Sequence, residues 1–475
     1  MTKKYFSRIS IALITLIIVN YSCASKHQNS DLASKKPWEN MQKTINGIEA
    51  PVFINKVFDI TNYGAQSGGI INNTEAFNKA IKACSENRGG IVLVPQGKFL
   101  TGAIHLESNI NLQIEENAEI IFSTNPDDYP IVHTSFEGTE VMNYSPLIYA
   151  YQKTNVAITG KGTLNGQGNN RNWWSWCGKD TYGWKKGAPI QNVARLMEMA
   201  EAGVPVSERV FGDGYNLRPN FVEFFECKNV MLKDIKIINA PFWLIHPMKS
   251  TNVIIDGVTV TSHGPNNDGC DPEYSKNVII RNCSFNTGDD CIAIKSGRDA
   301  DGRRVGITTE NVFVQNCKMF DGHGGVSIGS EISAGVRNVF VENCVMDSPD
   351  LDRAIRIKTN TKRGGFVENL YVRNIEIGEV GESVLGIDLF YSVHGNQSGN
   401  YMPRIENIYF ENIKVKNGGK FGILAKGHKE SPIKNIQFKN VTIDKVKSNY
   451  SIENVQNLTF INTKINGALI ESPKN

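Results

Sequence analysis

The segments NVIIRNC (277–283), NVFVQNC (311–317) and NVFVENC (338–344) repeat one short phrase. In each, an asparagine precedes three apolar residues, one polar residue, a second asparagine and a cysteine. β-Branched and aromatic residues favour strands, while asparagine favours turns because it tolerates left-handed backbone angles. Each segment therefore predicts one short strand with a turn at both ends.

The same phrase, with variations, runs through the second half of the chain. Successive copies begin 22 to 38 residues apart. Their first asparagines are Asn229, Asn252, Asn277, Asn311, Asn338, Asn369, Asn407, Asn435 and Asn457. Repeats of this length indicate a solenoid, and little between the strands has the period of a helix. We therefore predict an all-β fold, a right-handed parallel β-helix over residues 56–475.

Two segments depart from the repeat. In residues 74–87, apolar side chains recur at helical spacing, which predicts an amphipathic helix that caps the N-terminal end of the solenoid. Residues 169–218 form an insertion with four tryptophans and a helical stretch at 191–202. Insertions in solenoids often lie on the binding face. The tryptophans either contact a sugar or pack the small core of the insertion itself.

The N-terminus has the pattern of an export signal. Three basic residues precede an apolar run at 9–19, which is too short to span a bilayer comfortably. We assign residues 1–23 to the signal and 24–55 to a linker. Cys23 resembles the lipidated cysteine of a bacterial lipoprotein, so both lipidation and simple cleavage are left open. We expect an exported protein, either periplasmic or an outer-membrane lipoprotein, or otherwise secreted.

Composition limits the partners. The chain of 475 residues has 51 Lys and Arg against 48 Asp and Glu, and three of the basic residues lie in the signal. This balance does not favour nucleic acid, so an anionic partner must be held by local positive charge. We expect a monomer.

The cysteines support more than one interpretation. Cys283, Cys317 and Cys344 follow a repeat asparagine where other copies have Ile or Val, which predicts buried thiols. Cys270 and Cys291 share a predicted slot on neighbouring coils, so a disulfide between them is left open.

Ionisable residues fill one position of successive repeats. Small residues close four coils, at Ser275, Ser296, Ser330 and Thr359. The residues seven positions before them are Asp268, Asp289, His323 and Asp352. Neighbouring coils lie about 4.8 Å apart, so this slot, with Asp290 beside it, crowds three carboxyl groups. One of them should have a raised pKa, as an acid for glycosidic cleavage requires, and His323 can share its proton.

Two cations follow on the next coil. Arg356 and Lys358 are two residues apart on a strand and therefore face the same side. Small residues align with Arg356 on the preceding coils, and Lys295 aligns with Lys358. This arrangement predicts a groove floor in which the cations bind a substrate carboxylate, with Lys295 as a further candidate.

Four blocks of sequence resemble the signature blocks of glycoside hydrolase family 28, the polygalacturonases. They are NNDGCDP (266–272), TGDDCIAIKSG (287–297), DGHGGVSIGSE (321–331) and RIKT (356–359). The resemblance runs from about residue 58 to the last repeats. It implies a right-handed parallel β-helix and inverting hydrolysis of α-1,4-linked galacturonic acid in polygalacturonate or pectin, without metal or other cofactor.

The resemblance also assigns roles, residue by residue. Asp289 would be the general acid, and Asp268 and Asp290 the bases that activate water. His323 would support protonation of the acid, and Arg356 and Lys358 would bind the substrate carboxylate. Tyr391 matches a family aromatic residue at the sugar site. Asn267 supplies an amide where the family has a hydroxyl, and it is a further candidate for substrate binding.

The segments NAPFWLIHP (239–247) and SGRDADGRR (296–304), with the tryptophan-rich insertion, resemble the exo-acting bacterial members. We therefore expect release of single galacturonates from the non-reducing end, with the insertion closing one end of the groove. Trp243, His246 and Arg298 are the candidates for recognition of the chain end.

The alternatives are a rhamnogalacturonan-directed galacturonohydrolase, an endo-polygalacturonase, a calcium-dependent pectate lyase and a non-catalytic glycan-binding β-helix. A non-catalytic protein would leave the three carboxyl groups unexplained.

Overall fold

The computed structural model describes residues 35–392 and 398–473. The chain forms two compact units, residues 1–49 and 50–475, which are treated separately. In the first, residues 35–46 are helical, although the stretch 24–55 was expected to be a linker. The predicted signal and Cys23 lie outside the described residues. No helix in the described part combines the length and the apolar character needed to cross a membrane.

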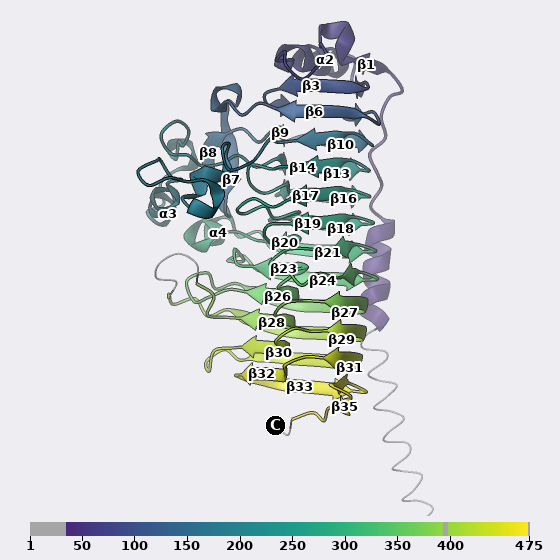
Figure 1. Ribbon diagram of the computed structural model, residues 1–475, viewed down its shortest axis with the longest axis vertical. Helices are drawn as coiled ribbons and strands as arrows, with labels where there is room; N and C mark the ends of the chain where they lie inside the picture. The colour runs from purple at the N-terminus through teal and green to yellow at the C-terminus, as the bar shows by residue number, and fades with distance from the viewer. Residues whose placement is uncertain (1–34, 393–397, 474–475) are drawn as a thin grey trace, which may run out of the picture. The chain divides into compact units, whose positions relative to one another are not determined.

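The second unit is a right-handed parallel β-helix, as predicted, with each coil contributing strands to three columns (Figure 1). Val, Ile and Phe alternate inward along these strands and form one continuous core. The first column consists of β1 (Val57–Asp59), β2 (Gly90–Val94), β5 (Ile110–Ile114), β10 (Thr154–Gly160), β13 (Lys228–Lys233), β16 (Thr251–Asp256), β18 (Lys276–Arg281), β21 (Thr309–Gln315), β24 (Val336–Glu342), β27 (Phe366–Glu379), β29 (Arg404–Asn417), β31 (Ile433–Lys445) and β33 (Val455–Ile461).

The second column lies beside the first, and the long strands β27, β29 and β31 run through both. Its other strands are β3 (Gly97–Thr101), β6 (Ala118–Phe122), β11 (Thr163–Asn165), β14 (Lys236–Ile238), β17 (Thr259–Ser262), β19 (Ser284–Thr287), β22 (Lys318–Met319), β25 (Val345–Met346), β34 (Lys464–Ile465) and the antiparallel β35 (Ala468–Leu469).

The third column carries the predicted site. Its strands are β4 (Ile104–His105), β9 (Ile148–Tyr151), β12 (Val222–Phe225), β15 (Ile245–Met248), β20 (Ile292–Ile294), β23 (Val326–Gly329), β26 (Arg353–Lys358), β28 (Ser383–Asp388), β30 (Phe421–Lys426) and β32 (Ser448–Glu453). Single bridges through Cys270 and Glu273 join β15 to β20, so the column is continuous.

The repeat asparagines form ladders at the turns. Each has a positive φ, and each amide Nδ2 donates to the Oδ1 of the asparagine one coil before, at 2.9–3.2 Å from Asn155 to Asn457. The second asparagines make a parallel ladder that ends at Asn462. The residue that allows the turn thus also fixes the register of the next coil.

The predicted cap is present as α2 (Thr74–Glu86), which buries Phe77, Ala80, Ile81 and Cys84. The predicted buried cysteines at 283, 317 and 344 are also confirmed, each about 1% exposed. All eight described cysteines are free, so the disulfide left open between Cys270 and Cys291 is absent.

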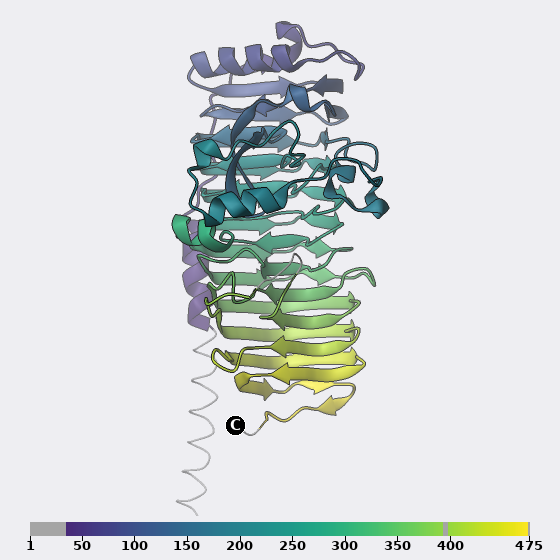
Figure 2. The same ribbon diagram turned by 90° about the vertical axis from the view of Figure 1, so that its left-hand side faces the viewer.

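Two additions stand on the third-column side of the upper coils (Figure 2). One is an antiparallel hairpin, β7 (Ile131–Phe136) and β8 (Thr139–Tyr144). The other is the predicted insertion, with helix α3 (Val193–Glu201). Both contribute to a second apolar cluster, to which Phe136 and Leu196 belong. A further short helix, α4 (Asp299–Val305), follows β20. Short 3-10 helices occur among the described residues at Ile60–Tyr63, Pro126–Asp128, Trp174–Cys177, Asp180–Tyr182 and Val206–Glu208.

Candidate active site

The register of the third column corrects the predicted slot by one residue. Cys270 pairs with Ile292, so Asp268 lies opposite Asp290 rather than opposite Asp289. The prediction that Asp268 and Asp289 occupy the same position on neighbouring coils is therefore wrong.

The cause is that the closing residues Ser275 and Ser296 are not equivalent. Ser275 leads directly into β18, whose first residue pairs with Glu310. Its counterpart on the next coil is therefore Thr309. Ser296 instead leads into α4. The residues seven positions before Ser275 and before Ser296 are therefore out of register with each other by one residue.

Asp289 and His323 do share a row, because Ile292 pairs with Val326 three residues further on. The Nδ1 of His323 lies 3.1 Å from Oδ1 of Asp289. This hydrogen bond is the main cause of the raised pKa of His323. Burial alone would raise the pKa of Asp289, but the bond and charge of His323 outweigh it and hold that pKa below its usual range. The two side chains thus hold one proton between them.

Asp290 is ionised and lies against two cations. Lys358 Nζ lies 2.7 Å from its Oδ2, Arg356 Nη1 lies 3.5 Å from its Oδ1, and Ser327 Oγ donates to the same Oδ1 at 2.7 Å. Burial opposes the charge of Asp290, but the two cations outweigh burial and lower its pKa. Asp290 is therefore a carboxylate able to accept a proton.

Asp268 is in the opposite state. Burial and then the charge of Asp289 raise its pKa to about 8, although Lys295 acts against this. One carboxyl group with a raised pKa was predicted, and Asp268 is that group in the free protein. Carboxyl groups this close titrate together, so we treat Asp268 and Asp289 as a pair that shares a proton at neutral pH. Asp289 is its more exposed member, with 19% of the side chain accessible against 4% for Asp268.

The three carboxyl groups each place an oxygen within 4.8 Å of the other two, a spacing at which oxygen ligands can hold a divalent cation. Side-chain cations already occupy these oxygens, however. Lys358 and Arg356 contact Asp290, and Lys295 Nζ lies 3.6 Å from Asp268 Oδ2. The donor set therefore suits protonation chemistry better than metal binding.

A pocket opens over the pair Asp268 and Asp289. Of the residues predicted to bind substrate, five line it: Lys358, Lys295, Tyr391, Arg298 and Trp243. Arg356 lies just behind, with its guanidinium 5.4 Å from the centre of the Tyr391 ring. Sequence reasoning missed the other lining residues, which are Glu137, Cys177, Lys179, Gln191, Asn266, Ser330, Glu331, Asn360 and Arg363.

The hairpin β7–β8 closes the end of the pocket nearest the N-terminal coils. Thr134 donates to Glu223 on the floor strand β12 at 2.9 Å. At the tip, Gly138 O accepts from the backbone of Arg298 at 2.9 Å, and Glu137 Oε2 pairs with Arg298 Nη1 at 2.5 Å. The insertion, which was expected to close one end of the groove, lines the pocket through Cys177, Lys179 and Gln191, and the hairpin adds the contacts at its tip. No repeat signal marks the hairpin, because its strands are not part of a coil.

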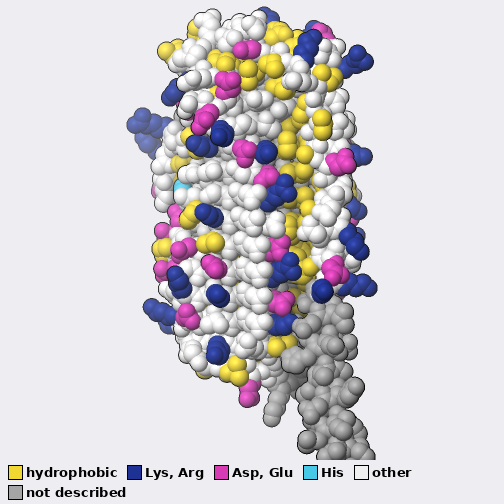
Figure 3. Space-filling view, turned by 90° about the vertical axis from the view of Figure 1, so that its right-hand side faces the viewer, with side chains coloured by type: hydrophobic (Ala, Val, Ile, Leu, Met, Phe, Trp, Pro, Cys, Tyr) yellow, Lys and Arg dark blue, Asp and Glu magenta, His cyan; other side chains and the backbone are white. Residues whose placement is uncertain are grey.

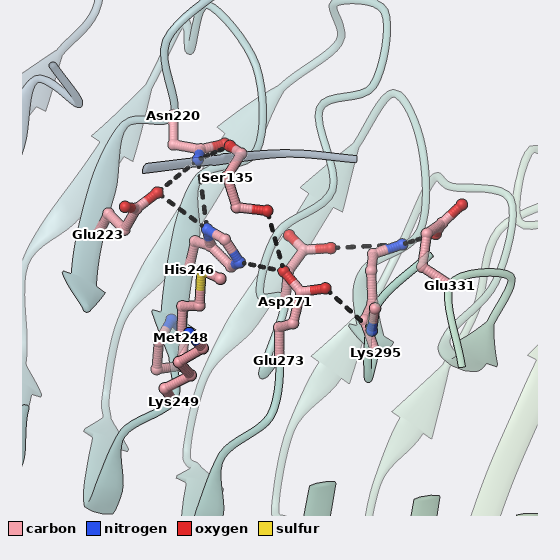
Figure 4. A network of polar contacts seen from close by, with 12 residues as sticks. Ser135, Asn220, Glu223, His246, Met248, Lys249, Asp271, Glu273, Lys295 and Glu331 are labelled. Carbon is pink, nitrogen blue, oxygen red and sulfur yellow. Dashed lines mark hydrogen bonds and ion pairs between the residues drawn. The ribbon is translucent and has the colours of Figure 1, made fainter. Parts of the chain in front are cut away.

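His246 does not reach the pocket, which corrects its predicted role. Its ring is fully buried, with Nδ1 3.1 Å from Glu223 Oε2 and Nε2 3.0 Å from Glu273 Oε2 (Figure 4). Burial opposes protonation, but the two glutamates outweigh it and raise the pKa of His246 to about 9. The imidazolium thus ties neighbouring coils together beneath the hairpin and has no free donor for a sugar.

Asn267 also has a structural role. It is fully buried, and its Oδ1 accepts from Ser262 Oγ at 2.6 Å and from Gly264 N at 2.8 Å, which holds the turn before Asp268. The prediction that it binds substrate is wrong, because its side-chain oxygen is already bonded within the turn.

Trp243 and Lys295 lie together at the back of the pocket, where each is about 97–98% buried. Lys295 Nζ lies 4.6 Å from the centre of the Trp243 ring. It also lies 3.2 Å from Glu331 Oε2 and 3.7 Å from Asp271 Oδ1. These contacts make Lys295 a buried counter-charge to the acids (Figure 4) rather than an open ligand for substrate.

The four tryptophans of the insertion favour the packing interpretation. Trp173 is 2% exposed and meets Trp176 edge to face, and the indole of Trp174 donates to Ala240 O at 2.8 Å. Trp184 donates to Ala188 O within the insertion. None of the four is among the pocket-lining residues of the described chain.

Comparison with known proteins gives a consistent result. The model of the family described as glycosyl hydrolases family 28 matches residues 212–464. A probable polygalacturonase of Vitis vinifera is 27% identical over 402 residues, which cover 81% of this chain and 73% of that protein. An exo-poly-alpha-D-galacturonosidase of Dickeya chrysanthemi is 28% identical over 381 residues, which cover 76% and 62%.

Among solved structures, the hyperthermoactive exopolygalacturonase from Thermotoga maritima matches with a TM-score of 0.88 and 43% identity, covering 92% of this chain and 97% of that one. A polygalacturonase from Erwinia carotovora ssp. carotovora matches with a TM-score of 0.63 at 23% identity, which supports the fold.

Proposed function

Because the chain belongs to glycosyl hydrolases family 28, we propose that it hydrolyses the α-1,4 linkages of polygalacturonate and releases galacturonate from the non-reducing end. The observation that carries the proposal is the pocket itself. It places a proton-sharing pair, Asp268 and Asp289, next to an ionised acid, Asp290, and beside cations that suit a uronic acid.

In this reaction the proton moves from the shared pair to the leaving glycosidic oxygen through Asp289, the member that faces the pocket. Asp290 is already a carboxylate and accepts the proton of the attacking water. His323 returns a proton to Asp289 through their hydrogen bond. Lys358 and Arg356 stabilise Asp290 in the free protein, and in the complex they bind the carboxylate of the substrate.

Exo action rests on the closed end of the pocket. The tip of β7–β8 stands over the floor strands on the N-terminal side and is fixed there by Glu137 and Arg298. A chain that enters from the open side must therefore present its end. The relatives from Dickeya and Thermotoga described as exo-acting support the same conclusion.

Inversion rests on the family alone. Inverting glycosidases usually separate their carboxyl groups by about 6.5–9.5 Å, and here oxygens of the three acids approach within 4.8 Å. Proton NMR of the anomer first released distinguishes inversion from retention directly.

The test of the function is product analysis on polygalacturonate and on rhamnogalacturonan oligosaccharides. We expect galacturonate as the only early product from polygalacturonate. Asp289→Asn should lower the rate by roughly 10²–10⁴-fold with an unchanged melting temperature, as for loss of a general acid. Asp350→Asn, an exposed acid outside the pocket, is the matched control. Full activity in Asp289→Asn, or products released only from rhamnogalacturonan, would overturn the proposal.

We also propose that the protein is exported, on the pattern of residues 1–23, with Cys23 as the attachment point of a lipid. Cell fractionation of the wild type and of Cys23→Ser, with labelled palmitate, tests both points. Label that remains in Cys23→Ser contradicts the anchor, and a wholly cytoplasmic protein contradicts export.

A further inference from the structure

The two edges of the pocket continue along the C-terminal coils. On one edge, Asp352 lies in the row of His323. The next strands, β28, β30 and β32, continue the column in parallel. The residues that directly precede their first paired residues are Glu382, Lys420 and Lys447, and these continue the row of Asp352. An edge that is acidic at the pocket therefore becomes basic two coils further on.

The opposite edge alternates in charge. Lys358 at the pocket lies in a row with Asp388, then with the exposed Lys426 on β30 and with Glu453 on β32, and Lys429 follows in the loop after β30. Beyond the pocket, lysines thus stand on both sides of the floor of the third column, with Lys420 and Lys447 on successive coils of one edge and Lys426 and Lys429 on one coil of the other. Strands are about 4.8 Å apart, so β32 lies about 14 Å from β26, the distance of a chain segment rather than of one sugar.

These lysines are not neutralised locally. Lys420, Lys426, Lys429 and Lys447 are exposed, and none forms an ion pair with a described residue. The acid on the first edge is neutralised instead, because Arg353 pairs with Glu382. Two exposed acids, at positions 430 and 453, lie on the same coils and leave the lysines in excess.

The floor offers an aromatic contact next to the pocket. Phe390 follows β28 directly before the pocket residue Tyr391, and it is 51% exposed. Its ring lies 4.1 Å from the His428 ring, centre to centre. An exposed ring suits the apolar face of a sugar.

The excess of lysine belongs to this end of the chain. Residues 404–475 contain twelve Lys and Arg against six Asp and Glu, whereas the whole chain has 51 against 48. A local basic surface on a nearly neutral protein attracts a polyanion at long range and does so less at high salt.

We propose that this surface, defined by Lys420, Lys426, Lys429 and Lys447 with Phe390, is an accessory binding site for an acidic polysaccharide chain. It holds the part of the chain that extends from the pocket toward the reducing end. The inference rests on the proposed function and adds to it a preference for long chains over short ones. The lysines stand on both sides of a floor that continues from the pocket, which suits an extended chain better than a flat anionic membrane.

The test is a variant in which all four lysines become glutamine. The matched control changes Lys414, Lys416, Lys434 and Lys464 to glutamine, which removes the same charge from exposed residues of the first two columns. On the face turned away from the hairpin, cationic and anionic side chains are mixed (Figure 3). Both variants are assayed on polygalacturonate and on trigalacturonate, at low and at high salt.

We expect the four-lysine variant to have a KM for polygalacturonate about tenfold higher than the wild type at low salt. Each exposed charge contact contributes a few tenths of a kcal/mol, and about 1.4 kcal/mol in total corresponds to a tenfold change. This difference in KM between the variant and the wild type should become smaller at about 0.5 M salt, because salt screens exposed charges. KM for trigalacturonate and kcat for both substrates should stay within about twofold.

An unchanged KM for polygalacturonate would overturn the inference, as would an equal loss on the trimer or in the control. If the four-lysine variant no longer binds phosphatidylglycerol vesicles but its kinetics on polygalacturonate are unchanged, the surface binds a membrane instead. Failure of the proposed function is recognised separately, because the wild type would then release no galacturonate from either substrate.

Discussion

Replacing Lys295 by methionine should move the alkaline limit of activity upward. The Lys295 ammonium lies 3.6 Å from Asp268 Oδ2, and both side chains are at least 96% buried. A positive charge favours the ionised carboxylate, so its removal raises the pKa of Asp268 above the present value of about 8. Activity needs the shared proton and should then persist to higher pH.

The size of the shift follows from the geometry. Unit charges about 4 Å apart interact by about 4 kcal/mol at an effective dielectric of 20, which corresponds to about 3 pKa units as an upper limit. Measured effects of one neighbouring opposite charge are about 1–3 units. We therefore expect the alkaline limb of kcat/KM to rise by at least about one pH unit.

The assay is galacturonate release from trigalacturonate across pH 4 to 10, because kcat/KM reports the ionisations of the free enzyme. Lys295→Arg keeps the charge and should restore the wild-type limb. Lys318→Met, an exposed lysine on β22, removes a charge far from the acids and should leave the limb unchanged. A folded, active Lys295→Met variant with an unmoved limb would refute the view that Asp268 holds the proton.

Three other outcomes are expected. The double variant Glu137→Ala/Arg298→Ala removes the ion pair at the hairpin tip without leaving one buried charge unpaired, and it should release some digalacturonate. Products are separated by anion-exchange chromatography. If the folded variant releases galacturonate only, the hairpin tip does not wall off the pocket. Chelation by EDTA should leave the rate unchanged, and a loss that calcium restores would favour a metal in the acid cluster. Asn277→Ala should lower the free energy of unfolding by about 1–3 kcal/mol, through lost ladder bonds and strain at φ +58°, and an unchanged urea midpoint would show that the ladder adds no stability.

The fold was predictable because its signal is local and repeated. Each asparagine at a first-ladder position, such as Asn277 or Asn311, stands at the start of its strand, directly before the apolar residues, so sequence spacing alone identifies the coils. The cap α2 was equally visible, since Phe77 and Ile81 recur at helical spacing within one short segment.

The site was predictable in its members and less so in its details. Counting placed Asp268 one residue out of register, because the turn after Ser275 differs from the turn after Ser296. It also could not separate pocket residues from buried ones. His246 and Arg298 were both expected to recognise the chain end, but the hairpin β7–β8 covers the floor around His246 and leaves Arg298 at the pocket. That covering is a long-range contact with no sequence period.

The stacking of similar coils affects how such a protein can gain or lose coils during evolution. Each coil contacts mainly its two neighbours, so a coil added or lost beyond β30 alters the length of the molecule and leaves the geometry around Asp289 untouched. The catalytic coils and the C-terminal coils are therefore separately adjustable. Duplication of a single asparagine-flanked repeat would lengthen the reach along a substrate by about 4.8 Å without a new fold or a new active site.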